Sequence, residues 1–84
     1  PYVRLLIDSL RTVSSTRDYG VVLDYVVQKS NGDPSPSQTV AAMYDISSAN
    51  VRQIFSRTRR RLLAAIDEDP DGLGPLLEIW WLAA

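Results

Sequence analysis

Residues 45–62 read DISSANVRQIFSRTRRRL, and they set the architecture expected for this chain of 84 residues. Asp45 tolerates the left-handed backbone of a tight turn better than most residues other than glycine, and Ser47 is a favourable N-cap for a helix. At 100° per residue, six side chains after Ser47 form one stripe that must pack on other helices: Val51, Ile54, Phe55, Thr58, Leu62 and Ile66. The pattern predicts a tight turn followed by a long amphipathic helix.

The same helix collects the positive charge of the chain. The whole sequence has a net charge of −1, yet residues 47–66 hold five arginines and no acid, so the other 64 residues carry a net charge of −6. Such a helix can approach a polyanion while the rest of the domain faces elsewhere. The alternative is a solvated surface whose arginine stems cover apolar groups. The side chains expected to point directly away from the buried stripe are Ala49, Gln53, Ser56 and Arg60, with Arg52 and Arg59 on one flank and Asn50, Arg57 and Arg61 on the other.

Helical spacing also dominates the rest of the chain. It predicts helices near residues 2–13 and 17–29, although the valine-rich second segment also fits a strand. Ser35-Pro36-Ser37-Gln38 is a capping-box pattern, which predicts a short third helix over 36–44. Ala41 is expected where this helix touches the next one across a three-residue turn, as a helix-turn-helix requires.

The expected fold is therefore all-α, with four to five helices around a central helix-turn-helix formed by residues 36–44 and 48–66. Residues 1–84 are read as one DNA-binding domain. Residues 1–35 supply supporting helices, and residues 67–84 supply an acidic linker and an apolar C-terminal helix. The chain begins with Pro1 and not with Met, so a fragment of a longer protein is one expectation and a trimmed chain is the other.

The composition of the chain argues against an enzyme. The sequence has no Cys and no His, which removes disulfides, thiolate metal sites and imidazole acid–base catalysis. Its acidic cluster at 67–71 reads as a solvated helix end. We therefore expect no enzyme activity, no catalytic residue, no metal and no cofactor. No apolar run approaches the ~20 residues of a membrane span, and no signal peptide is visible. A cytoplasmic, nucleoid-associated protein without membrane contact is expected.

Residues 38–66, about a third of the chain, resemble region 4 of bacterial RNA polymerase sigma factors, especially the extracytoplasmic-function type. The similar segments are VAAMYDIS at 40–47, NVR at 50–52 and SRTRRRL at 56–62. The family has an Ile-Ala pair, a short turn with Ser, then Thr-Val-Lys/Arg and Ser-Arg-Ala-Arg-Lys/Arg-x-Leu. LuxR-type response-regulator domains share the first half of this pattern but less of its tail.

The resemblance implies sequence-specific recognition of the −35 promoter element in transcription initiation, together with contact to the RNA polymerase core. The residues it would bring nearest to double-stranded DNA are Ser48, Ala49, Asn50, Arg52, Gln53 and Arg57. Asn and Gln side chains suit adenine and Arg suits guanine, whereas later arginines such as Arg60 would lie near phosphates. The chain departs from the family in three places. Asp45 stands where Gly is usual, the 31–36 loop is longer, and the upstream Arg-rich pattern is missing, with Asp18 and Asp24 reducing phosphate attraction there.

The C-terminal segment offers a second candidate surface. Leu73, Leu76, Leu77 and Trp80 fit one face of a helix over 73–82, with Trp81 to the side. This helix either closes the small core or presents a partner-binding patch of Leu77, Trp80 and Trp81, because Trp is enriched at interface anchors. We expect Trp81 to be more exposed than Trp80. The rival function is thus a protein-interaction module of a transcription regulator, which binds a regulatory protein through the basic helix or the Trp-rich helix.

Overall fold

The computed structural model describes residues 2–83, in which helices are joined by short turns and loops and no strand occurs. Four main helices come first: α1 (Val3–Val13), α2 (Thr16–Ser30), α3 (Pro36–Tyr44) and α4 (Ser48–Glu68). Three short turns of helix follow: α5 (Pro70–Leu73), the 3-10 helix η1 (Gly74–Glu78) and α6 (Trp80–Ala83). The all-α expectation is confirmed, and the valine-rich second segment is a helix, so the strand alternative was wrong.

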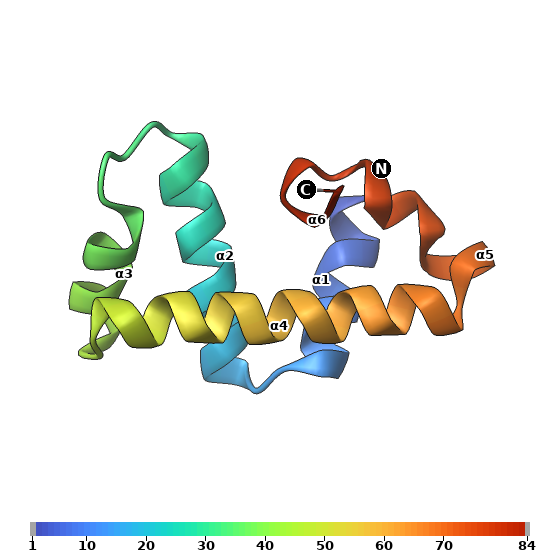
Figure 1. Ribbon diagram of the computed structural model, residues 1–84, viewed down its shortest axis with the longest axis horizontal. Helices are drawn as coiled ribbons and strands as arrows, with labels where there is room; N and C mark the ends of the chain where they lie inside the picture. Colours follow the sequence, from blue (N-terminus) through green and yellow to red (C-terminus); the bar gives the residue numbers. More distant parts are fainter. Residues whose placement is uncertain (1, 84) are drawn as a thin grey trace.

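The other helices pack along the long helix α4. It has 21 residues, which is about 30 Å at ~1.5 Å per residue. Figure 1 shows it running along the long axis, with α2 and α3 against its amino-terminal half and α1 and the C-terminal turns against the other half. No helix within residues 2–83 is long and apolar enough to cross a membrane.

The turn between α3 and α4 has the predicted geometry. Asp45 adopts the left-handed conformation, with φ 54° and ψ 49°, and its N–H donates to the carbonyl of Ala41. The N–H of Ile46 donates to the same carbonyl at 3.1 Å. Ser47 then caps α4, since its hydroxyl accepts the N–H of Asn50 at 3.0 Å. Ala41 is buried at this crossing. The two helices therefore meet across a three-residue turn.

The start of α3 differs from the expected capping box. Ser35 is the N-cap, but its side chain makes no capping hydrogen bond. The Asp33 carboxylate instead accepts the Ser35 N–H at 2.8 Å and the Thr39 hydroxyl at 2.5 Å. These two bonds, that from Thr39 first, lower the pKa of Asp33. A carboxylate two residues earlier thus orders the 31–36 loop against α3, which the Ser-x-x-Gln pattern did not reveal.

The core is centred on one side of α4. The stripe predicted from helical spacing is buried at Val51, Ile54, Thr58, Leu62 and Ile66, and Phe55 beside it is half-buried. The other helices contribute Leu10, Val21, Val22, Val40, Leu76, Trp81 and Leu82. This burial fixes the rotation of α4, so the opposite side has to face outward.

The C-terminal segment is not the single helix expected over 73–82. A new 3-10 helix begins at Gly74, with Pro75 in its first turn, and Ile79 after it is extended with φ −73° and ψ 128°. The extended residue rotates the last turn relative to the preceding one. As a result Trp81 is 4% exposed and Trp80 is 52% exposed, the reverse of the predicted order.

Trp81 is buried because it extends a row of aromatic rings. Its ring lies 5.5 Å from that of Phe55 on α4, and Phe55 lies 4.7 Å from Tyr25 on α2. Arg59 holds the segment in place, since its Nε donates to the carbonyl of Trp81 at 2.7 Å and its Nη2 to that of Leu82 at 3.2 Å. The C-terminal turns therefore close the core beside α2 and α4.

Candidate nucleic-acid interface

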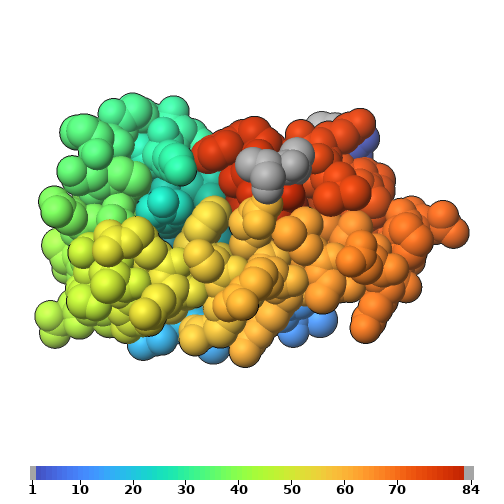
Figure 2. All heavy atoms as spheres, in the orientation of Figure 1, coloured from blue at the N-terminus to red at the C-terminus, as the bar shows by residue number. Residues whose placement is uncertain are grey.

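The side of α4 opposite the core is uncovered. Figure 2 shows it as the yellow-to-orange band across the front of the molecule. The side chains predicted to point outward, Ala49, Gln53, Ser56 and Arg60, are all exposed, as are Arg52 and Arg61. Because the apolar stripe fixes the rotation of α4, this polar and basic side is permanently presented to solvent.

Two open hollows follow this side of the helix. The larger, of about 540 Å³, is lined by Ala49, Arg52, Gln53, Ser56, Arg57 and Arg60. The smaller, of about 300 Å³, is lined by Arg57, Arg60, Arg61 and Ala64. The two share Arg57 and Arg60, so they form one continuous surface, here called the α4 face. It begins with small and amide-bearing residues and ends with guanidinium groups.

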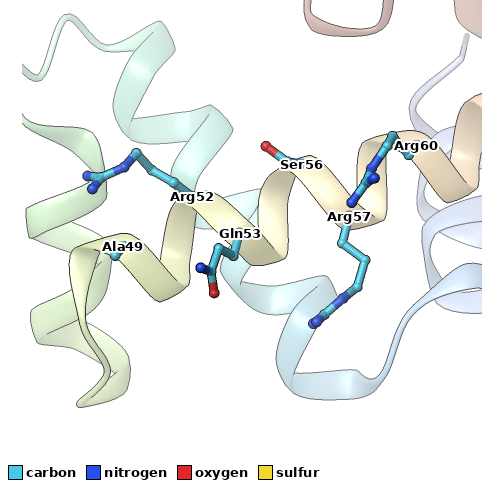
Figure 3. Close-up of a pocket in the computed structure, with 6 residues that line it drawn as sticks. All are labelled: Ala49, Arg52, Gln53, Ser56, Arg57 and Arg60. Atoms are coloured by element: carbon cyan, nitrogen blue, oxygen red, sulfur yellow. The ribbon is translucent and has the colours of Figure 1, made fainter.

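The arginines of the α4 face extend to both flanks of the helix. In Figure 3, Arg52 extends to one side of the helix, toward α3, and Arg57 extends to the other, toward the start of α2, whereas the guanidinium of Arg60 lies over the helix between them. Arg52 Nη1 donates to Ser37 Oγ at 3.2 Å, which directs this side chain toward the first turn of α3. Gln53 lies between the flanks and remains exposed. The outer line of the helix is therefore uncharged in its first half, with cations along its edges.

Arg57 is held by an acid on another helix. Its Nη2 lies 2.8 Å from Asp18 Oδ2, and Arg17 Nη2 lies 3.0 Å from Asp18 Oδ1. Burial raises the pKa of the Asp18 carboxyl, but the hydrogen bonds from Arg17 and Arg57 outweigh burial and hold that pKa below its usual 3.8. Asp18 is thus an anion at neutral pH, and it fixes the position of both guanidinium groups.

The other sequence-predicted DNA residues lie at the start of α4. Ser48 and Asn50 are half-buried in its first turn, whereas Ala49 is exposed between them. Sequence reasoning missed Arg17 and Ser37, which the fold brings beside Arg57 and Arg52. Residue spacing holds no signal for these pairs, because they join α4 to different helices.

The predicted partner patch is not one surface. Leu77 and Trp80 are exposed, at 45% and 52%, but Trp81 is buried. The prediction that Trp81 belongs to a partner-binding patch was therefore wrong, because that ring completes the core. Trp80 instead lies beside the amine of Lys29, which is 6.0 Å from its ring centroid.

Comparisons of the chain with protein-family models, with curated proteins and with solved structures find no match. Function therefore has to be inferred from the residues and geometry of this chain.

Proposed function

We propose that this domain binds double-stranded DNA by placing α4 in the major groove, in the manner of sigma region 4 at the −35 element, and so acts in transcription initiation. The observation that carries the proposal is the α4 face. This side of the helix is exposed, and it has uncharged residues along the outer line of its first half with guanidinium groups on both flanks. It follows directly after the tight turn that joins α3 to α4. A helix about 10–12 Å in diameter matches a groove about 12 Å wide.

Within this proposal, different residues of the α4 face contact the bases and the phosphates of the DNA. Ala49 permits close approach, and Gln53 suits the paired donor and acceptor of adenine. Arg60 is exposed, and no hydrogen bond or ion pair to it is found within residues 2–83, so its charge is available to a phosphate. Arg52 is held toward α3, which fits either a base at the groove edge or a phosphate beside it. Base contacts would set the sequence and phosphate contacts the affinity.

Binding to duplexes over a range of salt concentrations tests the proposal. Arg60→Ala should weaken binding to every duplex and reduce the slope of log K against log salt by about one, the value for one lost phosphate contact. Arg4→Ala removes the same charge from an exposed position on α1, so the slope should stay unchanged. If the two variants behave alike, the effect is one of net charge and the α4 face is not the binding surface.

Selection of binding sites from random duplexes, with and without RNA polymerase core, tests sequence reading. Gln53→Ala should change the preferred base at one position, at about 1–3 kcal/mol per good base contact. A domain that enriches no sequence under either condition would be a tether and not a reader.

A protein-interaction module is the second candidate, and exposed Leu77 and Trp80 favour it. Large apolar side chains at the surface are common anchors of protein interfaces. Under this alternative, Trp80→Ala would abolish co-purification with a partner protein while Arg60→Ala leaves it intact. Under the DNA proposal alone, Trp80→Ala leaves duplex binding unchanged.

A further inference from the structure

Arg17, Asp18 and Arg57 form a compact cluster between α2 and α4. Arg17 Nε and Nη2 both donate to Asp18 Oδ1, at 3.2 Å and 3.0 Å, and Arg57 Nη2 donates to Oδ2 at 2.8 Å. The Asp18 side chain is only 9% exposed, whereas those of Arg17 and Arg57 are 54% and 42% exposed. The Asp18 carboxylate is therefore the buried part of the cluster, and the two guanidinium groups are its exposed part.

The backbone around Asp18 is also fixed. The Asp18 N–H donates to the hydroxyl of Ser15, the N-cap of α2, at 3.1 Å. A carboxylate in the first turn of a helix is favoured by the helix dipole. The carboxylate therefore acts as a rigid support, and the two guanidinium groups that it binds are held side by side instead of moving freely.

The charge of this cluster matches one phosphate. Two guanidinium groups and one carboxylate leave a net charge of +1, equal and opposite to the charge of a DNA backbone phosphate. Each guanidinium has five N–H donors; Asp18 accepts from two of them on Arg17 and one on Arg57, and Arg57 Nε is buried, so three donors remain on each group. Planar groups with donors remaining suit phosphate oxygens.

The cluster lies where a DNA strand would pass. Arg57 belongs to both hollows of the α4 face, and it extends to the side opposite Arg52, toward the start of α2 (Figure 3). The two walls of a major groove are phosphate strands, so a helix in the groove has one strand on each flank. Arg52 lies on the flank that would face one of these strands, and the cluster lies on the flank that would face the other.

We propose that Arg17 and Arg57, set side by side by Asp18, together bind a single backbone phosphate on the α2 side of a duplex held by the α4 face. This inference rests on the proposed function and adds a helix outside the helix-turn-helix to the interface. Asp18, which on sequence grounds only repels DNA, is then a positioning residue for two phosphate-binding cations.

The pair Arg17 and Arg57, binding one phosphate together, is here called the clamp. Salt-dependent duplex binding by Arg17→Ala, Arg57→Ala and the double variant tests it. If both cations serve one phosphate, removing either leaves a cluster of zero net charge, so each single variant should lose about one unit of salt slope. The double variant should also lose about one unit and not two. Arg4→Ala is the matched charge control and should leave the slope unchanged.

Three results would overturn the clamp. A double variant that loses about two units means that each arginine binds its own phosphate. An unchanged slope in Arg17→Ala, with a reduced slope in Arg60→Ala, removes Arg17 from the interface but leaves the proposed function intact. No salt-dependent binding by the unaltered protein overturns both proposals together.

Lysine variants separate the clamp from an effect on folding. Alanine at either position leaves Asp18 with one partner, so circular dichroism is needed to establish that each variant folds. Arg17→Lys and Arg57→Lys keep the charge and lose the planar fork. They should therefore keep the wild-type salt slope while affinity at fixed salt falls several-fold. Unchanged affinity in both lysine variants would contradict shared binding of one phosphate by two guanidinium groups.

Discussion

Thr58 lies in the middle of the buried stripe of α4, and replacing it with valine should stabilise the domain. The residue is 0% exposed, and its hydroxyl has no hydrogen-bond partner within residues 2–83. An unpaired buried hydroxyl costs about 1–3 kcal/mol. Valine has nearly the same shape and the same helix propensity as threonine, so little is lost in exchange. We expect a net gain of about 1 kcal/mol, which raises Tm by about 4–8 °C in a domain of this size.

Urea unfolding followed by circular dichroism measures this gain as a higher midpoint at unchanged m-value. Thr58→Ser keeps the hydroxyl and removes the methyl group, so it should lose about 1 kcal/mol. Thr12→Val, at an exposed position on α1, should change stability by less than about 0.5 kcal/mol. A Thr58→Val protein less stable than the original would refute the reasoning, because it would mean that the hydroxyl has a partner. Its salt slope for duplex binding should stay unchanged, since Thr58 faces the core.

Three further predictions concern single contacts. Asp45→Gly should be more stable than Asp45→Ala by about 1 kcal/mol in thermal unfolding, because only glycine adopts φ 54° without strain; equal stabilities would contradict the turn. Arg59→Ala should shift tryptophan emission to the red as Trp81 gains solvent, and an unchanged spectrum would show that the carbonyl contacts do not hold the C-terminal turns. The hydrogen bond that Tyr44 donates to Asp24 raises the pKa of Tyr44 to about 12. Its contribution to stability is therefore complete below pH 10 and is lost as pH rises through 12. An absorbance titration should show one tyrosine with this raised pKa, and Asp24→Asn should return the pKa of Tyr44 toward 10.

The sequence predicted the parts of the fold that depend on local pattern. Helical spacing and caps gave α1 to α4 nearly to the residue, and Asp45 was correctly placed as the left-handed turn. The buried stripe of α4 was also correct, because a long helix with a one-sided apolar pattern leaves no other way to pack. These features are determined by residues a few positions apart.

The structure of the C-terminal segment was predicted less well, because the burial of its side chains depends on the backbone conformation of a single residue, Ile79. Gly74 and Pro75 interrupt the helix, and extended Ile79 turns the next residues by an amount that helical periodicity cannot supply. Trp80 and Trp81 thereby exchange the expected environments. The contacts that settle the matter, Phe55 against Trp81 and Arg59 against its carbonyl, join residues more than twenty positions apart.

The candidate site has the same division between local and distant determinants. Periodicity identified the outward side of α4 and divided its arginines between two flanks and the outer line, but it could not indicate which of them contact other helices. The fold gives the five arginines different surroundings: Arg60 is exposed, Arg52 contacts α3, Arg57 contacts Asp18, Arg59 holds the C-terminal turns, and Arg61 donates to the carbonyl of Val13 on α1. Only coordinates could assign these roles, because each partner lies on a different element.

Under the proposed function, the acidic remainder of the domain would determine the side from which DNA approaches the α4 face. A duplex would then be repelled by the other 64 residues, whose net charge is −6, and attracted by residues 47–66 with their five arginines, so its approach would be favourable from the side of α4. The same balance limits total affinity, because few phosphates can be neutralised before acidic groups come near. Under the proposed function, the domain would need a second attachment to remain on DNA, and we propose that promoter-bound polymerase core supplies it by raising the effective concentration of the domain. The domain alone should therefore bind duplexes weakly and with a small salt slope, and polymerase should increase its occupancy without changing the preferred sequence.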